Sequence, residues 1–244
     1  MGDGPITEFR IGSVLARSLG VLGNNLVPFG MVSIVFLAPQ FVLPFVLVSL
    51  LGVTGSVAVV VAWYLSVALV WILTYFLLSA VLMYGTIGEL RGNRASIGQS
   101  IRWVLGLLFP IIGVAIVATL GVFAGMLLFV VPGFILLAMW WVAVPAAVVE
   151  RTGVVESLRR SARLTSGHRW RLFGIFILIG VAQSVLDILA NLLFGDLEIL
   201  GSVISSAIFV AVTAVYAVVG AVCYHDLRVL VDGVDADEIA RVFE

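Results

Sequence analysis

Residues 103–149 read WVLGLLFPIIGVAIVATLGVFAGMLLFVVPGFILLAMWWVAVPAAVV, a run of 47 residues without an acidic, basic or histidine side chain. The hydrocarbon core of a bilayer is about 30 Å thick and needs about 20 apolar helical residues to cross it. The run is too long for one membrane span and long enough for two. Val131-Pro132-Gly133, near its middle, is a turn signal. These residues predict a helical hairpin in a membrane.

Two further stretches have the same character. Residues 18–88 carry no charged or histidine side chain, and residues 172–224 carry only Asp187, Asp196 and Glu198. Gly52-Val53-Thr54-Gly55 and Gly195-Asp196-Leu197-Glu198 are their turn signals. We therefore predict an all-α, polytopic transmembrane bundle of about six spans arranged as three hairpins. The spans are expected near 26–51, 57–88, 109–131, 134–150, 170–194 and 200–224.

The composition agrees with a single membrane domain over residues 1–244. Hydrophobic residues make up 62% of the chain and charged residues 11%, whereas a soluble domain has about 25% charged residues. The net charge of −1 gives no basic surface of the kind that binds nucleic acid. With Cys223 as the single cysteine, no intramolecular disulfide can form.

The arginines predict the orientation of the chain. All 13 basic residues are arginine, and none lies inside the three apolar stretches. Short loops rich in arginine stay on the cytoplasmic side of a membrane. We therefore predict a multi-pass protein of the cell membrane with its N- and C-termini in the cytoplasm.

A short amphipathic segment precedes each predicted hairpin, at residues 11–17, 97–102 and 154–160. In each, an apolar residue recurs after four positions and an arginine follows, which is helical spacing. We predict a cytoplasmic amphipathic helix before each hairpin. Either chance similarity explains the pattern, or the chain is a degenerate repeat over 6–90, 94–150 and 153–228, followed by an acidic C-terminal tail at 229–244.

The third amphipathic segment and the start of the fifth span carry the densest group of arginines. Arginine side chains present planar, multi-donor forks to phosphates, and clusters of them beside a membrane bind anionic headgroups. Glu156 can pair with Arg160 at i,i+4. The alternative role is topology control and anchoring. The candidate residues for lipid-headgroup binding are Arg159, Arg160, Arg163, Arg169 and Arg171.

A polar stripe is predicted inside the fifth span, where Gln183, Asp187 and Asn191 recur every four residues. An ionisable side chain inside a membrane is costly and marks a candidate functional site. A proton relay, or a cavity for an ion or headgroup, would use such a stripe. Two alternatives remain open: interhelical hydrogen bonding, and a span that ends early and leaves the stripe at the interface.

No catalytic constellation is evident. His168 and His225 lack partners at metal-ligand spacing, and the sequence has no common catalytic motif. We expect no enzyme activity, no cofactor and no metal site. The interpretation is a non-catalytic membrane module that engages membrane lipids, anionic ones among them, or protein partners at the cytoplasmic leaflet. The alternative is a transporter or channel for a small solute, ion or lipid that uses the polar stripe.

Several motifs resemble the glycerophosphoryl diester phosphodiesterase membrane-domain family. They are the runs at 132–136, 145–153, 156–161, 167–171 and 224–229, followed by Gly233-Val234-Asp235. The resemblance implies a helical fold and membrane residence. In some members of that family the membrane region is fused to a soluble catalytic barrel, which these 244 residues do not contain. The resemblance therefore does not imply hydrolysis of glycerophosphodiesters.

Overall fold

The computed structural model describes residues 8–51, 57–90 and 97–233, and these residues form an all-α fold. The bounds of the helices are α1 Ile11–Asn24, α2 Leu26–Leu51, α3 Val57–Leu90, α4 Ile97–Gly106, α5 Leu108–Leu128, α6 Val130–Trp140, α7 Ala143–Glu150, α8 Val154–Leu164, α9 Arg169–Phe194 and α10 Glu198–Asp232.

The helices form three hairpins, and a short helix precedes each one. Helices α2 and α3 pack together, as do α5 with α6 and α9 with α10. The short helices α1, α4 and α8 lie where the sequence predicts amphipathic segments. The degenerate repeat over 6–90, 94–150 and 153–228 stays a prediction, because the order of helices alone does not test it.

Within the described residues, five helical segments are long and apolar enough to cross a membrane. A sixth crossing exists if α1 and the start of α2, which are bent by 88° across Asn25, count as one broken span. The prediction of about six spans falls within this range. The five segments are Trp63–Glu89, Leu108–Leu128, Val130–Glu150, Arg169–Phe194 and Leu200–Asp232.

The fourth predicted span differs from the prediction, because it consists of two helices. Instead of one helix at 134–150, α6 begins at Val130, and the chain is interrupted at Trp141 and Val142 before α7. Pro145 explains the break, since it has no backbone N–H and its ring clashes with the carbonyl of residue i−4, which is Trp141. The hairpin turn also lies earlier than predicted, at the extended residue Phe129.

Of the other two predicted hairpin turns, the structure describes one and not the other. The turn predicted at Gly52–Gly55 lies outside the described residues. The turn at Gly195–Glu198 agrees with the structure, because α9 ends at Phe194 and α10 begins at Glu198. The sixth predicted span ends too early: α10 continues to Asp232 and stops at Gly233, whose φ of +66° is left-handed. The first residues of the predicted tail at 229–244 are thus helical.

The buried core lies in the half of each hairpin that is remote from its turn. Core side chains come from the start of α2, α5 and α9 and from the end of α3 and α10, and residues 143–149 of α7 are all buried. Toward the turns the side chains are exposed, as for Leu128 and Leu192, at 73% and 75%. The hairpins are held together at one end only.

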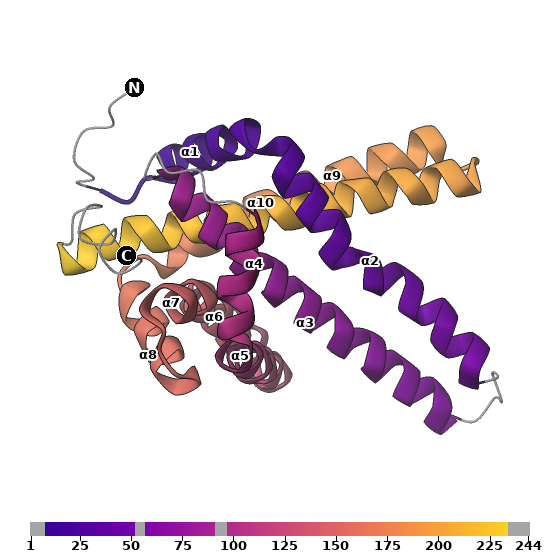
Figure 1. Cartoon of the computed structure of the whole chain (residues 1–244), viewed down its shortest axis with the longest axis horizontal. Helices are drawn as coiled ribbons and strands as arrows, with labels where there is room; N and C mark the ends of the chain where they lie inside the picture. The colour runs from indigo at the N-terminus through magenta and orange to yellow at the C-terminus, as the bar shows by residue number, and fades with distance from the viewer. Residues whose placement is uncertain (1–7, 52–56, 91–96, 234–244) are drawn as a thin grey trace.

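The hairpins leave this shared end in different directions. In Figure 1, α2/α3 and α9/α10 diverge toward their turns, while α5 and α6 are seen nearly along their axes. Helices α1, α4, α7 and α8 gather at the shared end, beside the last turns of α10.

Candidate functional site at the arginine-rich end

Arg160 lies at the centre of a buried ionic network that joins three helices. Its Nε donates to Oε1 of Glu150 at 2.7 Å, and its Nη1 donates to Oδ1 of Asp232 at 3.0 Å. Its Nη2 pairs with the second carboxylate oxygen of Asp232. The Tyr224 hydroxyl donates to the same Glu150 oxygen at 2.9 Å. The network therefore fastens α8 to α7 and to the end of α10.

The environment of Arg160 fixes its charge. The residue is only 8% exposed, and its hydrogen bond to Asp232, together with that to Glu150, raises the pKa of the Arg160 guanidinium above its ordinary value. Arginine does not lose its proton in proteins in any case. The predicted pair between Glu156 and Arg160 is wrong: Glu156 pairs with Arg159 instead, at 3.1 Å on the exposed side of α8.

A second ionic contact fastens α1 to α10. Arg17 pairs with Asp226, whose side chain is 1% exposed. The ring of His225 lies beside the same carboxylate, with Nδ1 3.4 Å from Oδ1. His225 thus lies beside the ion pair that joins α1 to α10.

The five candidate headgroup residues occupy different environments. Arg160 is inside the network, while Arg159 and Arg163, on the adjoining faces of α8, are exposed. Arg169, at the first turn of α9, donates from Nη2 to the Ala162 carbonyl at 3.4 Å. Arg171 is exposed and donates from Nη1 to the Phe9 carbonyl at 2.9 Å. The structure therefore presents four of the five at or near the surface.

The acidic residues of this end were not predicted as site residues. Glu150, Asp226 and Asp232 supply the carboxylates of both contacts. A signal exists for one of them, since Arg228 and Asp232 are spaced i,i+4, and their charged groups lie 3.9 Å apart. The other pairings join residues up to 209 positions apart, so no local pattern predicts them.

The three residues of the predicted polar stripe all lie on α9, but the described residues give them no side-chain partner. Gln183 and Asp187 are half-buried and Asn191 is exposed. Within the described residues, no side-chain hydrogen bond or ion pair joins the three to another group. Their neighbours Ile188 and Leu189 are 59% and 48% exposed, so the stripe lies on an otherwise apolar surface.

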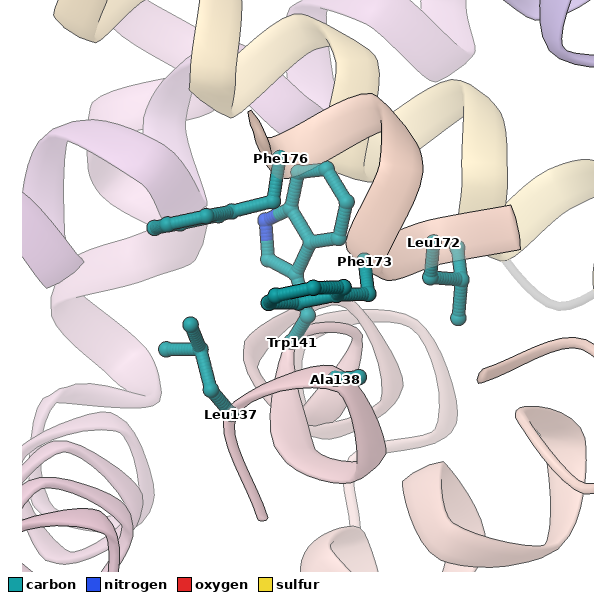
Figure 2. Close-up of a pocket in the computed structure, with 6 residues that line it drawn as sticks. All are labelled: Leu137, Ala138, Trp141, Leu172, Phe173 and Phe176. Atoms are coloured by element: carbon teal, nitrogen blue, oxygen red, sulfur yellow. The ribbon is translucent and has the colours of Figure 1, made fainter. Parts of the chain in front are cut away.

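An apolar depression lies between α6 and α9. Leu137, Ala138 and Trp141 line one side, and Leu172, Phe173 and Phe176 line the other (Figure 2). The empty space over it is about 150 Å³, most of it open to the surroundings, so the depression is a shallow surface seam that encloses no room for a water molecule. The sequence did not predict this pocket, because it depends on how two distant helices pack. The searched, described residues contain no cluster of three or more histidine, cysteine or acidic side chains suited to a metal ion.

Comparison with known families identifies the chain only at the level of the family. Residues 40–226 match the family model described as "Domain of unknown function (DUF7847)". The chain belongs to this family. No curated protein and no solved structure matches it. The DUF7847 region runs from the second half of α2 to most of α10 and includes the candidate arginines at 159–171.

This finding corrects the family predicted from the motifs. The matching family model is DUF7847, and nothing in the comparisons points to the glycerophosphoryl diester phosphodiesterase family. The motifs misled because they combine features common to membrane hairpins. Proline and glycine punctuate turns, and arginines flank apolar spans. Shared physical constraints of this kind do not establish common descent.

Proposed function

We propose that this member of the DUF7847 family is a multi-pass integral membrane protein of the cell membrane. Its arginine-rich end and both termini lie on the cytoplasmic side, where it acts as a non-catalytic module that binds anionic lipid headgroups. The observation that carries the proposal is the segregation of charge: arginines gather at the shared end, while exposed side chains along the hairpins are apolar.

The charge balance of this end supports headgroup binding. The carboxylates of Glu150, Asp226 and Asp232 are engaged in the internal network. Arg163 is exposed and forms no ion pair within the described residues; Arg160 is the main cause of the lowered pKa of the Asp232 carboxyl, and the charge of Arg163 adds to it. Each arginine near an anionic leaflet contributes about 1 kcal/mol. Removal of two exposed arginines is thus expected to cost about 2 kcal/mol, or roughly 30-fold in lipid preference.

A cysteine-accessibility experiment tests the orientation. In a Cys223→Ala background, one cysteine is introduced at Asp196, in the α9–α10 turn, and another at Ser166, between α8 and α9; both positions are exposed. We expect a membrane-impermeant maleimide to label D196C in intact cells and S166C only after permeabilisation. The reverse pattern, or labelling of both from outside, would contradict the proposal.

A second experiment tests lipid binding. The full chain is purified from membranes of phosphatidylglycerol and phosphatidylcholine, and retained lipids are quantified by native mass spectrometry. We expect phosphatidylglycerol to be enriched and the double variant R159Q/R163Q to lose much of that enrichment. The matched control is Arg10→Gln, because Arg10 is exposed, lies outside α8 and, like Arg159, has an acidic neighbour at 3.1 Å. No preference for phosphatidylglycerol in the unmodified chain would overturn the headgroup function.

The alternative function, transport of a small solute, ion or lipid, rests on Asp187. A half-buried carboxyl group on an apolar helix is a candidate for ion or proton transfer. It has less support than headgroup binding, because no described polar side chain extends the stripe by hydrogen bonding. Proton and cation flux into proteoliposomes, compared between the unmodified chain and Asp187→Asn, tests it. Flux that disappears in the variant would favour transport.

A further inference from the structure

The depression between α6 and α9 has an arginine at one end. Arg169, Phe173 and Phe176 are spaced i, i+4 and i+7 on α9, which places them on one face of the helix. Phe173 and Phe176 line the depression (Figure 2). Side chains on a helix lean toward its N-terminus, so the Arg169 guanidinium lies beyond the lined region, toward the arginine-rich end.

Arg169 has an unused hydrogen-bond donor. Its Nη2 donates to the Ala162 carbonyl at 3.4 Å, but its Nε is buried and has no hydrogen-bond partner. A buried polar group without a partner calls for a specific explanation. A phosphate oxygen would supply the missing acceptor once the flexible arginine side chain rotates toward the mouth of the depression. The guanidinium fork fits a phosphate better than any other common anion except a carboxylate.

The aromatic side chains around the mouth fit the boundary between headgroups and acyl chains. Trp170 is 78% exposed, and its ring lies 6.3 Å from that of Phe173. Phe134 of α6 packs against Phe173 from the other side at 5.0 Å. Tryptophan is enriched at membrane interfaces. A charged group at the arginine and an apolar depression below it match a ligand with a phosphate head and a hydrocarbon tail.

We propose that the seam between α6 and α9 binds one anionic phospholipid, with its phosphate at Arg169 and an acyl chain along Trp141 and Phe176. The proposal rests on the membrane placement and headgroup function argued above, and it names one site for them. Phosphatidylcholine also carries a phosphate. However, its trimethylammonium group would lie near Arg169 and Arg171, where like charges repel each other.

We expect Arg169, rather than the apolar depression, to determine which lipid headgroup the site prefers. An acyl chain is surrounded by hydrocarbon both in the bilayer and against the depression. Its transfer between the two therefore contributes little hydrophobic free energy to binding. Hydrogen bonds to charged groups are stronger than neutral ones. Loss of the Arg169 guanidinium is therefore expected to weaken phosphatidylglycerol binding at this site by about tenfold or more.

Two variants and a control test the site in the full chain. Arg169→Gln removes the phosphate ligand, and Leu137→Trp fills the depression without touching an arginine. Arg10→Gln is the matched control, since it removes one exposed arginine that neither lines the depression nor belongs to the candidate headgroup residues. The probes are phosphatidylglycerol in exchange titrations followed by native mass spectrometry, and phosphatidylglycerol with a photoreactive diazirine on one acyl chain. Crosslinked peptides are then identified by mass spectrometry.

We expect the first retained phosphatidylglycerol to be lost from R169Q and L137W but kept by R10Q, with crosslinks at 137–141 and 173–176. Should both variants retain phosphatidylglycerol as the unmodified chain does, or should the crosslinks lie elsewhere, this site is wrong while the proposed function stands. A chain that never prefers phosphatidylglycerol overturns both. If R169Q fails to fold, L137W and the crosslinks still decide.

Discussion

Replacement of Arg160 by methionine is expected to destabilise the protein substantially. The change keeps the apolar stem and removes the guanidinium that bonds to Glu150 and Asp232. Removal of one partner from a buried ion pair costs about 3–5 kcal/mol. The side chains of Glu150 and Asp232 are 19% and 24% exposed, so water partly solvates the carboxylates left behind. We therefore expect the lower end, a loss of about 3 kcal/mol in the free energy of unfolding.

The assay is unfolding of the purified chain in mixed micelles by increasing fractions of SDS, followed by tryptophan fluorescence. Arg159→Met is the matched control, because the Arg159 side chain is 71% exposed and its ion pair is with Glu156. An exposed pair of this kind contributes about 0–1 kcal/mol. Adding Glu150→Gln to R160M is expected to recover part of the loss, because without Arg160 the Glu150 carboxylate keeps only the hydrogen bond from Tyr224, whereas Asp232 still has Arg228 3.9 Å away. Equal midpoints for R160M and R159M would refute the reasoning.

Two further predictions use the same assay. Arg151 has a left-handed φ of +49° and places its guanidinium 3.9 Å from the centroid of the Trp103 ring. The free energy of unfolding of R151A should fall by about 1–2 kcal/mol, because the cation–π contact is lost. That of R151G should fall by less, because glycine also relieves the left-handed strain. A β-carbon on Gly133 would lie 2.8 Å from the backbone nitrogen of Met126, so G133A should lose about 1–3 kcal/mol. Gly20 has no atom within 4 Å of such a carbon, and G20A should instead gain up to about 1 kcal/mol.

The long helices were predictable from the sequence because their determinants are local. The span predicted at 170–194 is α9, Arg169–Phe194, and the span predicted at 26–51 has the bounds of α2. The length of an uncharged run and the glycines or prolines beside it suffice for such assignments. The break at Trp141 was missed, because Pro145 acts on a carbonyl four residues before it while the apolar run continues unbroken.

The site was less predictable, because its contacts depend on tertiary structure. Local spacing favoured Glu156 as the partner of Arg160, yet the observed partners are 10 and 72 positions away. The same long-range pairing accounts for the extra turns of α10, whose polar end at Asp232 is stabilised by α8. The clustering of arginines in the sequence predicted which end of the molecule is charged. The packing of α7, α8 and α10 decides that Arg160 is buried while Arg159 and Arg163 are exposed.

The divergence of the hairpins has a mechanical consequence. A flat bilayer has one normal, and helices that point in different directions cannot all follow it along the shortest path. Beyond the shared core, side chains such as Leu128 and Leu192 are 73% and 75% exposed, so few buried contacts oppose a change in the tilt of a hairpin. Because helices tilt to match the thickness of the hydrocarbon around them, a thicker bilayer would favour upright hairpins and a thinner one hairpins that lean outward.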